Sequence, residues 1–513
     1  MENFIRHNFY PNNELTYIKS PHYEKNPFIS RSPEQGTLPT YEGSKHLLPK
    51  PYWQGHDDTI SCHDKAWQIA FRNLRMPKET SGFVSAFIDT AFNGYLFLWD
   101  SSFIMMFGRY ASRAFNFQKT LDNFYARQHK DGFICRELRE TGPGEHFTRH
   151  DPSSTGPAIL SWTEWEYYKT TADKERSSDV YYPLLAYHEW MKENHTWRDG
   201  TYWSTGWGCG MDNQPRVEPG RHEAFSHAHM VWVDACLQAI LDARTLIRMA
   251  TELGHEEDIS VLQAEIDHLT NVVNNRLWSE NDAFYYDEWR DGRLNGVKSV
   301  AAYWALLAEI VPPERLERFV AHLDNEKEFK RPNRVPTLSA DHPDYCPEGG
   351  YWCGSVWAPT NYMIMKGLEA TGYDQLAHEI ASAFVDHVTQ VYQDTETVWE
   401  NYAPETPAPG LGAGRLASKD FVGWTGLAPI AVLYEYVMGI KGDPVHKKIR
   451  WDVRLTEAHG IVDYPFGDCT VSLHCDTRIS ADDEPKVHAE TTSPLQIDVF
   501  WGDGQSKTLL FNM

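Results

Sequence analysis

A long run of helical periodicity, with no strand-like series inside it, constrains the fold more than any other feature of this sequence. Between about residues 62 and 440, apolar side chains recur every three to four positions in segments that often end at Gly. The pattern predicts helices over 64–75, 99–111, 114–128, 157–168, 181–194, 227–253, 256–277, 298–310, 313–323, 356–371, 373–392 and 422–438. Consecutive helices joined by short loops pack as antiparallel hairpins, and six hairpins in a ring give an (α/α)6 toroid barrel. We therefore expect a mainly α fold.

From residue 441 onward the apolar residues alternate with polar ones. They occupy every second position in the stretches 449–455, 469–475 and 495–501. This period predicts the strands of a small C-terminal antiparallel β-sandwich-like domain. Residues 1–60 contain seven prolines, which predict an extended arm that packs on the barrel or on the β domain. The expected division is an arm (1–60), a catalytic barrel (61–440) and a β domain (441–513).

The charge balance excludes several classes of partner. The formal net charge is −24, which disfavours binding to a phosphate backbone or to an anionic membrane surface. The sequence shows no apolar leader and no segment long enough to span a bilayer, so we expect a cytoplasmic protein. The eight cysteines form no Cys-x-x-Cys pair, and no nucleotide-binding motif occurs. We therefore expect neither a metal nor a cofactor.

Residues 206–216, Gly-Trp-Gly-Cys-Gly-Met-Asp-Asn-Gln-Pro-Arg, form a glycine-rich loop. Three glycines in five residues let the backbone bend sharply and approach another group closely. The loop carries Asp212 between Trp207 and Arg216, so a carboxylate stands among aromatic and polar groups. Two interpretations are open: a chemical site, or a surface turn in which Asp212 caps the next segment. Neither interpretation explains Cys209.

A second carboxylate is needed if this is a glycosidase site, because glycoside hydrolysis usually uses two carboxyl groups that face each other across the bond. The best candidate is Glu400 in Val-Trp-Glu-Asn-Tyr, residues 398–402. Trp399 and Tyr402 can raise its pKa or stack on a sugar ring. The alternatives are an acid held at a helix end by local hydrogen bonds, and the neighbouring Glu405 as the active group.

Aromatic and amide side chains close to glycines supply candidates for sugar binding. Flat rings stack on sugars, and amides and carboxylates exchange hydrogen bonds with hydroxyl groups. Asp100, next to Trp99, is either the N-cap of a helix or an acceptor for two sugar hydroxyls. Gln128 leads into a turn that is either a surface feature or a pocket wall. The predicted substrate-binding residues are Trp99, Asp100, Gln128, Trp207, Trp352, Trp357, Asn361, Tyr402 and Trp424.

The sequence resembles the inverting (α/α)6-barrel glycosidases, a group that includes trehalase, processing α-glucosidase I and mannosylglycerate hydrolase. The resemblance rests on motifs in the family's order: Trp-Asp-Ser-Ser-Phe (99–103), Asp-Gly-Phe-Ile-Cys-Arg-Glu (131–137), Gly-Cys-Gly-Met-Asp-Asn (208–213), Gly-Tyr-Trp-Cys-Gly-Ser-Val-Trp (350–357), Glu-Asn-Tyr (400–402) and Phe-Val-Gly-Trp (421–424). It implies that Asp212 is the general acid and Glu400 the general base. It also implies that Trp99 and Asp100 line the subsite of the non-reducing sugar. Further wall positions match Trp352, Trp357, Asn361 and Trp424.

Two positions depart from the family pattern. Gly208 and Cys209 stand where the family often has Glu-Ser, and Cys353 stands where it often has Arg. The second change removes a charge and a hydrogen-bond donor that the arginine would offer to the ligand. The identity of the sugar therefore does not follow from any one relative.

The reaction implied by the resemblance is hydrolysis of an α-glycosidic bond with inversion, in an α-glucoside or a related oligosaccharide. Asp212 would protonate the leaving oxygen, and Glu400 would take a proton from water on the opposite face. One alternative is a sugar epimerase on the same barrel, which would use histidines that the pocket motifs lack. A second is a non-catalytic sugar-binding protein.

Overall fold

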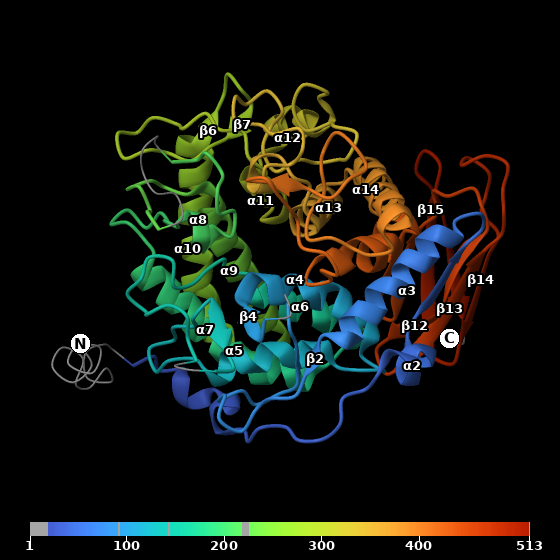
Figure 1. Ribbon diagram of the computed structural model, residues 1–513, viewed down its shortest axis with the longest axis horizontal. Helices are drawn as coiled ribbons and strands as arrows, with labels where there is room; N and C mark the ends of the chain where they lie inside the picture. The colour runs from blue at the N-terminus through green and yellow to red at the C-terminus, as the bar shows by residue number, and fades with distance from the viewer. Residues whose placement is uncertain (1–18, 91–92, 142–143, 218–224, 512–513) are drawn as a thin grey trace.

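The computed structural model describes residues 19–90, 93–141, 144–217 and 225–511, and its helices lie in two layers (Figure 1). The inner helices are α4 (Leu98–Gly108), α6 (Leu160–Thr171), α9 (Val233–Leu253), α11 (Trp304–Leu307), α13 (Ala358–Ala370) and the π-helix η13 (Ala428–Val437). Contacts link α4 to α6, α6 to α9, α9 to α11, α11 to α13, α13 to η13, and η13 back to α4. The inner helices therefore form a closed cycle.

The outer helices alternate with the inner ones along the chain. They are α3 (Asp57–Arg72), α5 (Asp122–Ala126), α7 (Lys174–Asn194), α10 (Ile259–Val272), α12 (Pro313–Val320) and α14 (Asp374–Thr395). Every residue of α4 is buried, whereas α3 buries one stripe that includes Cys62, Ala66 and Ile69. A helix covered on all sides is apolar all round, and a helix with one face in water is amphipathic, so the two layers follow from the side-chain patterns.

Short helical turns connect or extend these elements. They are η2 (Tyr23–Lys25), η3 (Pro27–Ser30), α2 (Tyr41–Ser44), η4 (Lys45–Leu47), η5 (Arg109–Ala111), η6 (Phe117–Leu121), α8 (Gly206–Cys209), η7 (Glu256–Asp258), η8 (Val273–Leu277), η9 (Val300–Tyr303), η10 (Ala321–Asp324), η11 (Tyr351–Cys353) and η12 (Thr425–Leu427). The single helix expected over 114–128 is η6 followed by α5. Asn116 starts this pair, since its side chain accepts a hydrogen bond from the Gln118 N–H.

The long helix expected over 227–253 begins later, at Val233. His229 has a φ of 55°, in the left-handed region, which a right-handed helix does not admit. The helix therefore does not include His227 and His229. Their rings lie 4.8 Å apart beside Trp197.

The C-terminal strands, drawn in orange to red in Figure 1, lie beside α3 and form two four-stranded sheets, one of which includes the N-terminal strand β1. One sheet has the order β1 (Lys50–Trp53), β12 (His459–Phe466), β13 (Cys469–Cys475), β14 (Val487–Thr491); the other has β10 (Ile440–Asp443), β11 (Lys448–Asp452), β15 (Leu495–Trp501), β16 (Gln505–Phe511). β11 and β15 pair in parallel, whereas only antiparallel pairs were expected. Alternating residues such as Ile449, Trp451 and Ile497 are buried.

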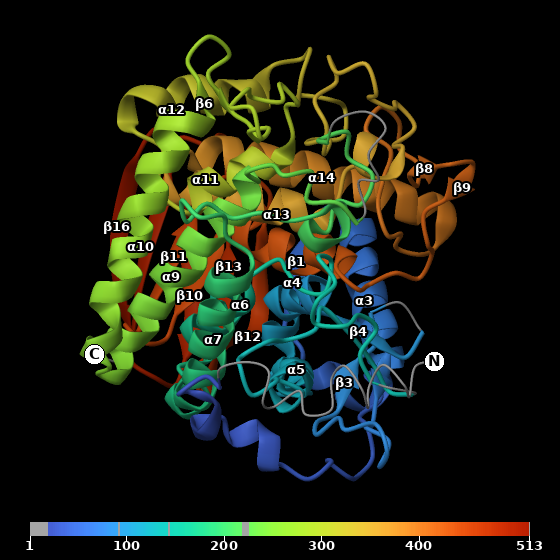
Figure 2. The ribbon, with the colours of Figure 1, turned by 90° about the vertical axis from the view of Figure 1, so that its left-hand side faces the viewer.

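Short strand pairs extend from the helical layers. They are β2 (Leu74–Arg75) with β3 (Phe87–Ile88), β4 (Tyr95–Phe97) with β5 (Glu137–Arg139), β6 (Trp278–Ser279) with β7 (Phe284–Tyr285), and β8 (Leu411–Gly412) with β9 (Arg415–Leu416). The β8–β9 hairpin lies at the periphery of the molecule in Figure 2. Within the described part of the chain, no helix has the length and apolar character that a membrane crossing requires.

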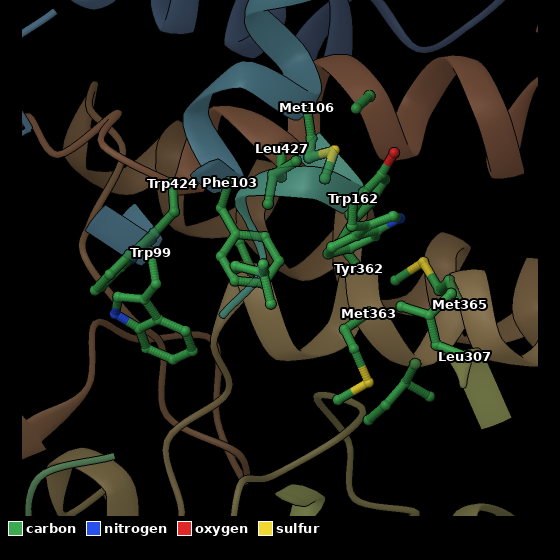
Figure 3. Close-up of a cluster of buried hydrophobic side chains, with 14 of the residues drawn as sticks. Trp99, Phe103, Met106, Trp162, Leu307, Tyr362, Met363, Met365, Trp424 and Leu427 are labelled. Atoms are coloured by element: carbon green, nitrogen blue, oxygen red, sulfur yellow. The ribbon is translucent and has the colours of Figure 1, made fainter. Parts of the chain in front are cut away.

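Aromatic rings fill the interior of the helical cycle (Figure 3). The distances between ring centroids are 6.0 Å for Trp424 and Trp99, 5.6 Å for Trp99 and Phe103, and 5.9 Å for Phe103 and Trp162. These are edge-on contacts, a favourable arrangement for ring pairs. These rings therefore pack the centre of the cycle and form a floor, against which the loop of Gly210 lies.

Candidate active site

The glycine-rich loop starts as one short helical turn. The hydroxyl of Thr205 accepts a hydrogen bond from the Gly208 N–H at 2.9 Å, which caps α8, and the turn ends at Gly210 with a φ of 81°. A β-carbon at Gly210 would overlap the indole of Trp99. Only glycine therefore lets the backbone lie on that ring and continue to Asp212. Cys209 is buried here, and its thiol donates to the carbonyl of Gly206.

The two residues after Asp212 bind the loop to the opposite side of the site. The Asn213 amide donates to the Gly350 carbonyl at 3.0 Å, and its oxygen accepts from the Trp352 N–H at 2.9 Å. The Gln214 amide donates to the Thr337 carbonyl at 2.9 Å. The loop and the 350–357 motif are thus held together by hydrogen bonds.

Arg216 anchors the end of the loop in a buried ion cluster. Its guanidinium makes two hydrogen bonds to Asp234, at 2.7 and 2.8 Å, and two to Asp287, at 2.8 and 2.7 Å. The side chain is only 1% exposed. A buried cation between two carboxylates is strongly destabilised when one partner is lost, so this cluster fixes the loop firmly.

A strand pair places Asp100 beside Arg136. Strand β4 runs into α4 and pairs with β5, so that Phe97 faces Glu137, and the Leu98 N–H donates to the Arg136 carbonyl at 2.8 Å. Asp100 is the third residue of α4, and the N-cap position is held by Phe97. The capping interpretation therefore does not account for this residue.

Three carboxyl groups influence one another in this region. Burial raises the pKa of Asp212 to about 7, Arg136 opposes the shift, and the charge of Glu400 adds to it. Burial also raises the pKa of Asp100 to about 8, again against Arg136 and with smaller contributions from Asp212 and Glu400. The structure thus brings together the carboxyl groups that the sequence separates by 112 and 188 positions.

Glu400 lies on the loop that follows α14. Burial raises its pKa, while hydrogen bonding to Ser418 lowers it; the Ser418 N–H donates to one carboxylate oxygen at 3.1 Å. Trp424 donates from its indole N–H to the Glu400 carbonyl at 2.9 Å. The rival candidate Glu405 instead forms an ion pair with Arg331 at 2.7 Å.

A cleft of about 400 Å³ opens onto Glu400. Its walls include Asn213, Tyr351, Arg415 and Ser418. The size is within the range of small-molecule sites. The cleft is lined by Glu400 and by Asn213, so it also borders the loop that carries Asp212. Among the residues that the structure describes, no group of three or more His, Cys, Asp or Glu side chains is placed to hold a metal ion.

Comparisons with known proteins identify the family of this chain. The family model described as "Mannosylglycerate hydrolase MGH1-like glycoside hydrolase domain" matches residues 94–425. The chain belongs to this family. It is a glycoside hydrolase. The matched segment contains α4, the glycine-rich loop, Glu400 and Trp424.

Individual relatives are distant. An uncharacterized protein of Borreliella burgdorferi is 25% identical over 372 residues, which cover 70% of this chain and 75% of that protein. The periplasmic trehalase of Xanthomonas axonopodis pv. citri is 27% identical over 168 residues, covering 32% of this chain and 28% of the trehalase. The crystal structure of the GH63 mannosylglycerate hydrolase of Thermus thermophilus with glucose has a TM-score of 0.57 and 22% identity, covering 72% of this chain and 99% of that one. This structural likeness concerns the fold.

In this glycoside hydrolase, two of the predicted rings form a double layer. Trp352 and Trp357 stack face to face with centroids 3.8 Å apart and planes 3° apart. Both side chains are buried, Trp352 with 1% and Trp357 with 0% of its surface exposed. Trp99 and Trp424 meet the edges of this pair. Trp207 is partly exposed and packs between Phe147 and Phe225.

Three predicted sugar-binding residues have their polar atoms bonded within the protein. The Gln128 amide donates to the Gly132 and Pro183 carbonyls, and its oxygen accepts from Asn26. Asn361 is fully buried; its amide donates to the Arg334 carbonyl at 2.5 Å, and its oxygen accepts from the Val335 N–H. The Tyr402 hydroxyl accepts from the Trp399 N–H at 3.1 Å. The structure gives these side chains partners other than a ligand.

Two functional candidates were not selected from the sequence. The phenol of Tyr351 has a raised pKa because of burial and the charges of Asp212, Glu400 and Asp100, which places it among the three carboxyl groups. Arg136 donates to the Trp207 carbonyl at 2.6 Å, and its charge acts on both aspartates. Both residues belong to the family motifs, which was the only signal available for them.

Proposed function

We propose that this glycoside hydrolase cleaves an α-glycosidic bond with inversion, using Asp212 as general acid and Glu400 as general base. The observation that carries the proposal is the pKa of Asp212, which burial and the charge of Glu400 raise to about 7 beside a cleft that Glu400 lines. A carboxyl group with a raised pKa keeps a proton at neutral pH and can deliver it to a leaving oxygen.

The reaction is a single displacement. Asp212 gives its proton to the glycosidic oxygen while the bond between that oxygen and the anomeric carbon breaks. A water molecule on the other face of the sugar forms the new bond, and Glu400 takes its proton. The hydrogen bond from the Ser418 N–H to Glu400 favours the ionised carboxylate that this role requires. Glu400 opens onto the cleft, which gives water a path to it.

The surrounding groups would bind the non-reducing sugar. Asp100, with a pKa of about 8, keeps its proton at neutral pH and can both donate and accept a hydrogen bond. Trp99, Trp352 and Trp424 supply ring surface on the side of the floor. We assign Gln128, Asn361 and Tyr402 a supporting role, because their polar atoms are bonded within the protein, and Trp357 the same role as the stacking partner of Trp352.

The substrate is an α-glucoside or a related oligosaccharide. Arg415, on the β8–β9 hairpin, lines the cleft, and its charge lowers the pKa of Glu400. An exposed guanidinium in a substrate cleft suits a carboxylate on the glycoside. The panel of substrates should therefore include α-glycosides of hydroxy acids as well as trehalose and malto-oligosaccharides.

The architecture is proposed as an (α/α)6 barrel. The closed cycle of six inner helices, each followed or preceded by an outer helix, supports it. The proposed domains are an arm over 1–60, the barrel over 61–440 and a β domain over 441–513. The pairing of β1 with β12 supports an arm that packs on the β domain.

Release of monosaccharide from the panel tests the proposal. Asp212→Asn and Glu400→Gln should each lose most of the turnover, and NMR should show the β-anomer first. Near-normal turnover in both variants, or an α-anomer formed first, would exclude the mechanism. Conversion of a free sugar to its epimer without release would favour the epimerase, and binding without any turnover would favour the non-catalytic sugar-binding protein.

A further inference from the structure

Cys346 and Cys353 begin and end a tight loop that carries Tyr351 and Trp352 into the site. All eight cysteines are thiols rather than disulfides. Cys346 and Cys353 are both partly exposed, whereas most of the others are buried. The proposed reaction uses neither thiol, and Cys353 stands where related sequences often have arginine.

The backbone brings the two cysteines together. The Cys346 N–H donates to the Cys353 carbonyl at 2.9 Å, and the Cys353 N–H donates to the Gly350 carbonyl at 3.2 Å. A β-carbon built on Gly350 would lie 2.6 Å from the Cys346 β-carbon and 3.3 Å from the Cys353 β-carbon. Both cysteine side chains therefore border the same space beside Gly350. A disulfide requires α-carbons about 4.4–6.8 Å apart, and two residues joined by a backbone hydrogen bond are already close neighbours.

The same loop holds the residue next to the proposed acid. The Cys353 thiol donates to the Asn213 carbonyl at 3.1 Å, and the Asn213 amide approaches the Cys353 sulfur at 3.6 Å. Asn213 also contacts Gly350 and Trp352 through its side chain. Cys353 is thus one of the groups that fix Asn213, and through the backbone Asp212.

We propose that Cys346 and Cys353 form a reversible disulfide by exchange with a low-molecular-weight disulfide, and that this bond slows the glycosidase by drawing the Cys353 sulfur away from Asn213. The regulatory half of the proposal rests on the function proposed above. The formation of the bond does not.

The exchange has two steps. The thiolate of one cysteine attacks oxidised glutathione, forming a mixed disulfide and releasing one glutathione thiolate. The second cysteine thiolate then attacks the protein sulfur of that mixed disulfide, forming the Cys346–Cys353 bond and releasing the second glutathione. Two protein thiols give up their protons to the buffer, and two electrons reduce the glutathione disulfide. Burial raises the pKa of the Cys346 thiol, so the exchange should become faster as the pH rises.

Mass spectrometry of the full chain after exposure to oxidised glutathione tests the bond. Glu348 lies between the two cysteines, so cleavage after this residue separates them unless a disulfide joins the fragments. The expected result is one linked pair of fragments that dithiothreitol separates. Two unlinked thiols, or glutathione adducts that never resolve into the link, would overturn the proposal.

Activity tests the effect on the site. The oxidised protein should turn over α-glycoside about tenfold more slowly or worse, in keeping with the cost of a small misplacement of a catalytic group. Dithiothreitol should restore the rate. Cys346→Ser should turn over substrate at the rate of the reduced wild-type protein, before and after treatment with oxidised glutathione. Cys469→Ser, which alters a partly exposed cysteine in β13, should still be slowed by that treatment. A linked protein with an unchanged rate would overturn the regulatory half.

The two proposals fail differently. If the reduced protein hydrolyses no α-glycoside, the proposed function is wrong, and the linked fragments still report on the disulfide. In that case hydrogen exchange of the backbone amides of residues 346–353 would show whether the bond moves the loop. If the reduced protein is active and no link forms, only the redox proposal is wrong.

Discussion

The α-carbon of Gly210 lies against the indole of Trp99, in a space that no β-carbon can share. This contact sets the path of the glycine-rich loop toward Asp212 and joins it to the aromatic floor of the cleft. It also supplies a sharp test of whether the loop geometry matters for activity.

Gly210→Ala should reduce both stability and turnover, because alanine would clash with Trp99 and also adopt a φ of 81°. Gly254→Ala is the matched control, since Gly254 has the same φ but nothing within 4 Å of a new β-carbon. The control should lose about 1–2 kcal/mol of unfolding free energy, from backbone strain alone, and keep its kcat. Urea denaturation and steady-state kinetics measure the two effects. Equal losses in both variants would show that contact with Trp99 is unimportant.

The pH dependence of kcat/KM should be bell-shaped. Asp212 must hold a proton, so activity should be present below its pKa of about 7 and fall as the pH rises through that value. Glu400 must be ionised, so activity should also fall as the pH drops through its own raised pKa. Because the carboxyl groups interact, the two limbs report values that belong to the cluster. A profile with no alkaline limb would contradict the role of Asp212 as general acid.

Asp212→Asn should lose about 10²–10⁴-fold in kcat on a glycoside with a poor leaving group. The loss should be much smaller on an α-glycosyl fluoride, because fluoride leaves without needing a proton. Glu400→Gln should be equally slow on both substrates, since activation of water is still missing. Equal losses for Asp212→Asn on both substrates would indicate that Asp212 does not act as a proton donor.

Arg216→Met should destabilise the fold by about 3–5 kcal/mol, because Asp234 and Asp287 would be left buried without their cation. The control is Arg248→Met, which removes an ion pair with Glu309 in which both side chains are about 40% exposed. The control should lose about 1 kcal/mol or less of its free energy of unfolding. The midpoint of urea unfolding measures both. A small loss in Arg216→Met would show that the cluster relaxes easily.

His188 should make stability depend on pH in the alkaline range. Burial would lower its pKa, but hydrogen bonds and charge from Asp242 and Glu265 raise it to about 10. This pKa is above that of a histidine in the unfolded chain. The contribution of His188 to the free energy of unfolding is therefore fully present below about pH 6.5 and is lost as the pH rises through about 10. His188→Gln should flatten the decline in unfolding free energy between those limits. An unchanged slope in this variant would exclude His188 as the source.

The sequence was most informative for candidate site residues that lie in short sequence motifs. The glycine pattern of residues 206–216 and the Trp-Asp and Glu-Asn-Tyr motifs identified the three carboxyl groups that the structure brings together. Helical periodicity located the helices, but α9 begins at Val233 and not at the expected residue 227. The left-handed φ of His229 interrupts the helix there, and the pattern of apolar residues gives no sign of this.

The exposure of individual side chains could not be predicted in the same way. Trp352 and Trp357 lie in the same sequence motif. Their stacking on each other depends on the tertiary structure, which the motif does not specify. The amide of Asn361 is used by the backbone of Arg334 and Val335, which lie 26 to 27 positions away. The parallel pairing of β11 with β15 likewise depends on how the two sheets meet, which alternation along each strand does not specify.

The pairing of β1 with β12 has a consequence for synthesis. Lys50 faces Val462 and Trp53 faces His459, so the first described strand leaves the ribosome long before its partner exists. The inner cycle also closes only when η13 meets α4. Contacts of such long sequence separation slow the final stage of folding. The nascent chain must therefore hold an incomplete ring until η13 is made, and an unpaired β1 until β12 is made.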